Sequence, residues 1–434
     1  QKEKLYDFLR EMEFNRLLSR AIDFYGETKK NPNTQIHKTS PSIINTKIYE
    51  SIVNEKSLEK WLKILNEQSV ISVDTETSSL NPIETDLVGI SFSYAPNKAC
   101  YIPLAHKNIK GLKKELVLKK IKPILEDPSI KKVGQNIKFD FIVFKQNGIE
   151  INPIEDTMLI SYTLDAGIHR HNLDILSEIH LKHKTISYKE LVGSGKNKLN
   201  FTDIELDQAT EYAAEDADVT LRLYNYLKLR LDKEKLNTIY EFFEKPMVRL
   251  LSKLELNGIK IDDSYLKKLS KKFKEKLEKT EKDIYFNAGK KFNIASPKQL
   301  GEIIYNDLKI AKLKKTKKGS LATSANVLED LALTGHIFPK LILEWRQISK
   351  LKNTYSDALQ DHINKKTKRV HTSFLLAATN TGRLASSDPN LQNIPIKSEE
   401  GREIRKAFIA EKKNILISAD YNQIEMRILA DMAD

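Results

Sequence analysis

The stretch VISVDTETSSL, residues 70–80, decides the fold of the first half of this 434-residue chain. Its opening run, Val70 to Val73, is rich in Val and Ile, which predicts a buried β-strand. Asp74 and Glu76 follow one residue apart, and in an extended chain such side chains project to one face. Two carboxylates on one face repel each other unless a cation lies between them, and a hard ion such as Mg²⁺ prefers oxygen ligands. A lone D-x-E pattern also fits a polar turn after a strand, so the metal hypothesis depends on further acids downstream.

Further acids occur in two places. The segment VGQNIKFDF, residues 133–141, begins like a strand, turns at Gly134 and continues as an apolar helix with Asp140 in its first turns. The segment EYAAEDAD, residues 211–218, lies inside a long helical pattern from about 206 to 231. Within it Tyr212 and Asp216 are four residues apart, hence stacked on one helix face.

The order Asp74 and Glu76, then Asp140, then Tyr212 and Asp216 resembles the DEDD exonucleases with a tyrosine. More specifically, it resembles the proofreading domain of the bacterial-type DNA polymerase I family (family A). The resemblance implies hydrolysis of a phosphodiester with two ions, Mg²⁺ or Mn²⁺, roughly 4 Å apart, which activate water and neutralise the phosphate. By the same resemblance Asp74, Glu76 and Asp216 hold one ion. Asp74 with Asp140 positions the other, and Tyr212 orients the attacking water.

The resemblance also implies contacts to a single-stranded 3′ end. Leu80 matches the position that wedges against the terminal base, and Tyr188 falls where the family uses a stacking aromatic. Asn136, in the segment of residues 133–141, is the third candidate for a contact to DNA. For Leu80 and Tyr188 a place in the hydrophobic core is an equally good interpretation of the sequence.

Composition bounds the class of protein. A chain of 434 residues predicts two to four domains. Its longest apolar runs are far short of a membrane span, and no signal peptide is visible. The sole cysteine, Cys100, excludes an internal disulfide and a cysteine metal cluster and fits a reducing compartment. The formal charge of +13 fits a nucleic-acid partner, although a chain rich in Ile and Asn also gains lysines by compositional bias. We expect a cytoplasmic, nucleoid-associated monomer.

The predicted fold is an α/β ribonuclease-H-like exonuclease domain, followed by a mainly helical thumb and the first part of an α+β polymerase palm. The chain begins without Met and is expected to be a piece of a longer protein, truncated after polymerase motif A. The predicted divisions are a connecting helix and linker from a 5′-nuclease region (1–46), the exonuclease domain (47–236), the polymerase entry and thumb (237–345) and the start of the palm (346–434). Strands are predicted at 70–73, 87–94, 99–103 and 130–133, and helices at 113–125, 139–146, 157–165 and 206–231.

The second half carries polymerase signatures. The basic loop KLKKTKKGS, residues 312–320, resembles the tip of the family's thumb, where lysines neutralise DNA phosphates. The candidate phosphate contacts are Lys314, Lys315, Lys317 and Lys318. The segment TNTGRLASSDPNLQNIP, residues 379–395, closely resembles a stretch peculiar to family A DNA polymerases. There the resemblance places Arg383 at the minor groove near the primer end, and Gln392 and Asn393 on the template and primer sides.

Near the C-terminus, residues 415–420 form an apolar run that predicts a strand ending in Asp420. The segment DYNQIEMR, residues 420–427, resembles polymerase motif A, with Asn422 where the family usually has Ser. The resemblance makes Asp420 a metal ligand of the polymerase site and Glu425 the gate that excludes a ribose 2′-hydroxyl. Because no second palm carboxylate follows on another strand, we do not expect this chain to extend a primer.

His169, His171, His180 and His183 form the only histidine cluster. Metal binding is one interpretation of this cluster, but the spacing matches no zinc template, so we predict a solvent-exposed or structural role for these histidines.

The leading hypothesis is a 3′–5′ exonuclease that hydrolyses DNA 3′ ends to 5′-mononucleotides. It would act on single-stranded ends and primer-template duplex, as part of a DNA-directed DNA polymerase of replication and repair that uses dNTPs. One alternative is a DNA-binding module with an idle exonuclease fold, against which the four intact acids count. The other is an RNA-trimming DEDD exonuclease, against which the polymerase signatures count.

Overall fold

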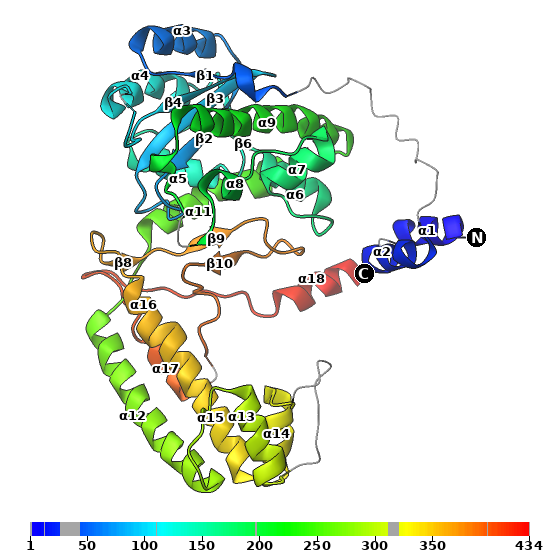
Figure 1. Cartoon of the computed structure of the whole chain (residues 1–434), viewed down its shortest axis with the longest axis vertical. Coiled ribbons are helices and arrows are strands. Elements are labelled where there is room, and N and C mark those ends of the chain that lie inside the picture. The colour runs from blue at the N-terminus through cyan, green and yellow to red at the C-terminus, as the bar shows by residue number, and fades with distance from the viewer. Residues whose placement is uncertain are drawn as a thin grey trace. The chain divides into compact units, whose positions relative to one another are not determined.

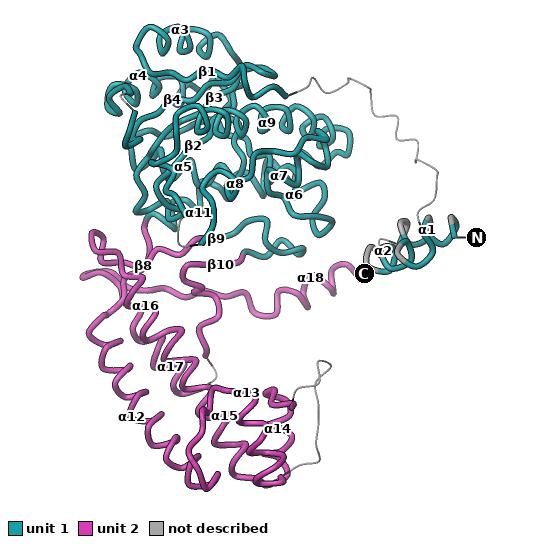
Figure 2. Tube along the Cα trace, in the orientation of Figure 1, with its two compact units in different colours: residues 1–256, 375–384 teal, residues 257–374, 385–434 magenta. Residues whose placement is uncertain are grey.

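The computed structural model describes residues 2–12, 14–26, 44–109, 111–195, 198–310, 321–396 and 398–433 (Figure 1). It divides into two compact units (Figure 2). Unit 1 comprises residues 1–256 and 375–384, and unit 2 comprises residues 257–374 and 385–434. Among the described helices, none is both long enough and apolar enough to span a membrane.

Unit 1 is built on a six-stranded sheet with the order β1-β4-β3-β2-β5-β6. The central strand β2 pairs antiparallel with β3 and parallel with β5, while β4 continues the antiparallel side and β6 the parallel side. The strands are β1 (Glu50–Ser51), β2 (Val70–Thr77), β3 (Leu87–Ala95), β4 (Lys98–Pro103), β5 (Lys131–Gly134) and β6 (Ile154–Asp156). The four predicted strands are therefore confirmed. The polar-turn interpretation of the D-x-E pattern is wrong, because Asp74 and Glu76 lie inside β2.

Helices surround this sheet, and the longest, α9 (Leu206–Lys233), packs against β2, β3 and β4 (Figure 1). The side of α9 that meets the sheet carries the small buried residues Ala213, Ala214 and Ala217, which allow a close approach. The Ser72 hydroxyl donates to the Ala217 carbonyl at 2.6 Å and fastens β2 to the helix. The other helices of unit 1 are α1 (Lys2–Glu11), α2 (Asn15–Tyr25), α3 (Glu55–Asn66), α4 (Lys114–Glu126), α5 (Lys138–Gln146), α6 (Thr157–Asp165), α7 (Leu173–Leu176), α8 (Tyr188–Val192), α10 (Asn237–Ile239) and α11 (Lys245–Asn257).

The four predicted helices are confirmed as α4, α5, α6 and α9. The patterns behind these predictions differ: α4 has one apolar face with the helical period, whereas α5 and α6 bury consecutive residues. The N-terminus of α6 also carries a cap, since the Asp156 side chain accepts from the Met158 amide.

Unit 2 is mainly helical and contains two apolar cores. In one, Leu266, Leu269 and Phe273 of the long helix α12 pack among buried residues that include Ile348. In the other, the far end of α12 joins the helices α13, α14 and α15. The helices are α12 (Asp263–Ala288), α13 (Pro297–Glu302), α14 (Ala325–Leu333), α15 (Ile337–Leu351), α16 (Ala358–Asp361), α17 (Glu399–Arg405) and α18 (Ile424–Ala433). Two small sheets pair β7 (Ile259–Lys260) with β8 (Arg369–Val370), and β9 (Ser373–Leu375) with β10 (Ala385–Ser387).

The strand predicted at residues 415–420 is wrong. These residues form irregular backbone, and Ile415 and Ile417 are 79% and 83% exposed. A strand exists only where another strand satisfies its backbone groups, and no described segment pairs with this run. The four candidate lysines, Lys314, Lys315, Lys317 and Lys318, lie outside the described residues.

Candidate active site

Three carboxylates converge at the junction of β2 and α9. Asp74 and Glu76 come from the strand and Asp216 from the helix, and one oxygen from each lies within 4.8 Å of those of the other two. The strand supplies two of them on one face because side chains alternate along it. The helix supplies the third because it crosses that face of the sheet. All three donors are oxygens, and Glu76 is only 8% exposed.

Asp140 lies beside this cluster, and its carboxylate binds Thr75 of β2. It lies in the first turn of α5, is almost fully buried, and its Oδ1 accepts bonds from the Thr75 amide at 3.0 Å and from the Thr75 hydroxyl. Thr75 lies between Asp74 and Glu76, so this pair of bonds links α5 to the strand that carries them. The structure therefore brings Asp140 next to the other acids, with one of its two oxygens already engaged.

The charges of the four acids interact strongly. Burial raises the pKa of Asp74 to about 7. The pKa of Glu76 lies well above its usual range, through burial first and then through Asp74, Asp216 and Asp140. Burial and the Asp74 charge likewise raise the pKa values of Asp140 and Asp216. Such a group of acids retains protons unless cations replace them, because like charges in a buried site oppose ionisation.

Tyr212 reaches the cluster from one turn before Asp216. Burial and then the Asp216 charge raise the pKa of its phenol, which also hydrogen-bonds with Asp216, so it remains protonated at neutral pH. Its ring lies 6.2 Å from the Tyr188 ring and 6.0 Å from the Phe201 ring, measured between centroids. The arrangement places one neutral O–H donor at the edge of an anionic site.

The predicted DNA contacts of unit 1 are accessible. Leu80 is 87% exposed and Tyr188 is 38% exposed, so the core interpretation is wrong for both. The Lys198 ammonium lies 5.4 Å from the centre of the Tyr188 ring. The Asn136 side chain is exposed on a residue with φ of 56°, a conformation that Asn tolerates. Its backbone N–H donates to Asp156 at 3.0 Å.

Sequence reasoning missed a buried support behind Glu76. Gly89 pairs directly with Glu76 across β2 and β3, and a Cβ atom on Gly89 would lie 2.0 Å from the Tyr101 hydroxyl. That hydroxyl lies 2.7 Å from Nε2 of His106. Burial and then the charges of Glu76 and Asp74 raise the pKa of Tyr101. The only signal in the sequence is a glycine inside an apolar strand, which is typical of a close approach.

A second missed residue is Glu215, which lies next to Asp216 in α9 and binds a different part of the chain. Its Oε1 lies 2.7 Å from Nε2 of His183, and its Oε2 accepts from the Ile186 amide at 2.7 Å. Both partners lie in the segment that leads into α8, which begins at Tyr188. Glu215 therefore holds the segment that presents Tyr188.

The polymerase-side candidates do not form a cluster that could hold a metal. Gln392, Asn393, Asp420 and Glu425 of unit 2 are exposed, as is Arg383 of unit 1. Among the described residues, Asp420 belongs to no group of three potential metal ligands. Their predicted roles remain predictions.

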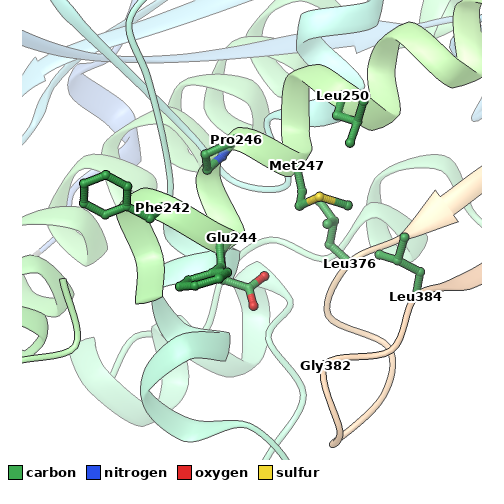
Figure 3. Close-up of a pocket in the computed structure, with 9 residues that line it drawn as sticks. Phe242, Glu244, Pro246, Met247, Leu250, Leu376, Gly382 and Leu384 are labelled. Carbon is green, nitrogen blue, oxygen red and sulfur yellow. The ribbon is translucent and has the colours of Figure 1, made fainter. Parts of the chain in front are cut away.

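Unit 1 also contains a pocket of about 380 Å³ that includes none of these acids (Figure 3). Its lining is apolar apart from Glu244, whose pKa is raised by burial. The lining residues are Phe242, Phe243, Glu244, Pro246, Met247, Leu250, Leu376, Gly382 and Leu384.

Comparison with known proteins matches both halves of the chain. Residues 49–232 match the 3′-5′ exonuclease family and residues 263–434 match DNA polymerase family A. DNA polymerase I of Rhizobium leguminosarum is 45% identical over 89% of this chain and 40% of its own length. DNA polymerase I of Pseudomonas aeruginosa is 40% identical over 100% of this chain and 48% of its own length. The chain thus spans less than half the length of these relatives.

A solved structure also matches most of the chain. It is the polymerase domain of Pol1 from M. smegmatis in complex with DNA primer-template and dNTP, with a TM-score of 0.72 and 28% identity. The match covers 88% of this chain and 62% of that one. The expected resemblance to bacterial DNA polymerase I is confirmed.

Proposed function

Because the chain belongs to the DNA polymerase I family, with an exonuclease domain followed by a family A polymerase region, we propose that it is a metal-dependent 3′–5′ exonuclease acting on DNA. The observation that carries the proposal is the convergence of Asp74, Glu76 and Asp216 next to Tyr212.

The donor set fits Mg²⁺ or Mn²⁺, since it consists of buried carboxylate oxygens whose mutual repulsion calls for a cation. Asp74, Glu76 and Asp216 would hold one ion, and Asp74 with the free oxygen of Asp140 would hold the second. When bound, two such ions supply an activated water and neutralise the phosphate.

The remaining side chains act on the DNA and the water. Tyr212 stays protonated and offers its O–H to orient the attacking water, with Glu76 as a nearby acceptor. Leu80 and Tyr188 are exposed and receive the bases of an unpaired 3′ end, the tyrosine by stacking. Hydrolysis of the terminal phosphodiester then releases a 5′-mononucleotide.

The decisive experiment is digestion of a 5′-labelled DNA single strand with Mg²⁺, with Mn²⁺ and with EDTA. Asp216→Asn should lower the rate by orders of magnitude, because it removes a ligand of the ion that stabilises the reacting charge. Asp207→Asn is the matched control, since Asp207 lies on the same helix with an exposed side chain. Full activity in Asp216→Asn, or in EDTA, would refute the proposal, and absence of digestion by the unmodified chain with either metal would favour a DNA-binding module.

The activities of the whole relatives belong to the same proposal. We propose that the parent protein synthesises DNA from dNTPs on primer-template in replication and repair, and that the chain is a monomer associated with the nucleoid in the cytoplasm. The polypeptide of these 434 residues should degrade a primer without extending it. The reason is that Asp420 is exposed and joins no cluster of ligands among the described residues.

A further inference from the structure

The histidine cluster after α6 contains two kinds of side chain. His171 Nδ1 lies 2.8 Å from the Ser161 hydroxyl, and His183 Nε2 lies 2.7 Å from Glu215. These two have the structural role predicted from the sequence. His169 and His180 instead turn toward Asp165, the last residue of α6.

Asp165, His169 and His180 bring three potential ligand atoms close together. One donor atom from each lies within 4.8 Å of those of the other two. His169 Nδ1 lies 3.0 Å from the Arg170 carbonyl, which can only accept, so Nδ1 carries the proton. Nε2 of His169 is then an acceptor that faces Asp165 Oδ2 at 3.6 Å. An imidazole N–H that donates to a backbone carbonyl is typical of a histidine that binds metal through its other nitrogen.

His180 supplies the second, independent observation. Its Nε2 is buried and has no hydrogen-bond partner in the described part of the chain, which is costly for a polar atom. A neutral imidazole has one nitrogen that can offer a lone pair to a metal ion.

The net charge of the groups around these three side chains favours a bound cation. Arg230 donates to both oxygens of Asp165 at 2.8 and 3.1 Å and to Glu234 at 2.9 Å. One guanidinium between two carboxylates leaves the group with one negative charge. A carboxylate has about four lone-pair positions, so Arg230 does not exhaust Asp165, and metal-binding carboxylates are commonly hydrogen-bonded in this way.

We infer that Asp165, His169 and His180 form a site for a divalent transition-metal ion such as Zn²⁺, separate from the carboxylate cluster. Two imidazoles and one carboxylate suit Zn²⁺ and its transition-metal neighbours rather than Mg²⁺. Tetrahedral bonds of about 2.1 Å place ligand atoms roughly 3.4 Å apart, which the 3.6 Å between His169 and Asp165 nearly satisfies. His180, on the helical segment Ser177–Leu181, would complete the set. A solvent molecule would take the fourth position.

The test is Zn²⁺ binding to the whole chain by equilibrium dialysis in excess Mg²⁺, which fills oxygen-only sites. We expect one Zn²⁺ per chain, with X-ray absorption showing scattering from two imidazoles. His169→Asn with His180→Asn should weaken binding at least about tenfold, whereas the matched control His336→Asn with His362→Asn, both exposed histidines of unit 2, should not.

Folding is checked separately by circular dichroism and by exonuclease rate in Mg²⁺. If the double variant fails to fold, His180→Gln alone serves, because the buried Nε2 has no hydrogen bond to lose. Absence of a bound Zn²⁺, undiminished binding in either histidine variant, or an absorption spectrum without imidazole scattering would each overturn the inference.

Discussion

Gly89→Ala tests whether the close approach of Tyr101 supports the active site. An alanine Cβ would meet the Tyr101 hydroxyl at 2.0 Å and two ring carbons at 2.3 Å, distances that no relaxed structure tolerates. Tyr101 has little room to move, because it is fully buried and packs against the rings of both His106 and Phe201. Forcing extra volume into a packed core costs about 1–3 kcal/mol, so we expect the free energy of unfolding of unit 1 to fall by about that amount.

The Gly89→Ala substitution should also affect the catalytic reaction. Gly89 pairs with Glu76 across the two strands, so any shift of β3 to relieve the clash displaces a predicted metal ligand. We therefore expect the exonuclease rate to fall together with the stability, and to fall at temperatures where unit 1 is still folded.

The assay exploits the two tryptophans. Trp61 is buried in unit 1 and contacts Tyr94, whereas Trp345 belongs to unit 2, so in a Trp345→Phe background the fluorescence reports unit 1. Urea unfolding of Gly89→Ala, Tyr101→Ala and the double variant gives a double-mutant cycle. Tyr101→Ala alone should cost about 3–5 kcal/mol, and the double variant little more, because the alanine at 89 then fills vacated space. A loss below about 0.5 kcal/mol in Gly89→Ala, or strictly additive losses, would refute the reasoning.

Three further predictions concern the Asp74 carboxyl, the ion pair of Lys138 with Glu255, and the lysines of the basic loop. Because burial raises the pKa of Asp74 to about 7 from 3.8, the metal-free protein is most stable when this group is protonated. Unit 1 should lose stability in EDTA as pH rises from about 4 to 7, and Mg²⁺ should suppress the loss; a flat profile would contradict it. Lys138 and Glu255 form a buried ion pair, so Lys138→Met should cost about 3–5 kcal/mol by removing the cation that the buried Glu255 carboxylate faces. Adding Glu255→Met should restore most of it in the Trp61 assay, and no recovery would count against the pairing. Replacing Lys314, Lys315, Lys317 and Lys318 by Gln should make the log–log salt slope of duplex binding shallower by about 0.9 per lost phosphate contact. An unchanged slope would show that these lysines do not contact DNA.

The predictable part of the site consists of local patterns. The pair Asp74 and Glu76 follows from the alternation of a strand, and the pair Tyr212 and Asp216 from the turn of a helix. Each pair lies within five residues of sequence, so it can be recognised without knowledge of the fold. The sequence predicts only Val70 to Val73 of β2 as a strand. The rest of β2, residues 74–77, is polar, and a polar segment is recognisable as a buried strand only once the packing of α9 over it is known.

The supports of the site were not predictable for the opposite reason. Tyr101 of β4 meets Gly89 of the neighbouring strand β3, Glu215 meets His183, and Asp165 meets His180, and each approach depends on how the fold packs. In each pair both residues look ordinary in the sequence. The histidines in particular showed no zinc spacing, because the third donor is a carboxylate at the end of the preceding helix.

The contrast between Asp74 and Asp420 shows what makes such an acid part of a site. Each follows an apolar run of β-forming residues, and the two runs predict strands equally well. The run before Asp74 hydrogen-bonds to β3 and β5, which bury it and point its acids at α9. The run before Asp420 has no pairing strand among the described residues, and it stays irregular and exposed. A buried position is what raises the pKa of Asp74 and creates the need for a cation. The proposed exonuclease chemistry therefore depends on pairing and burial that residues 70–218 supply among themselves, whereas the same acid on an unpaired run remains a solvated carboxylate.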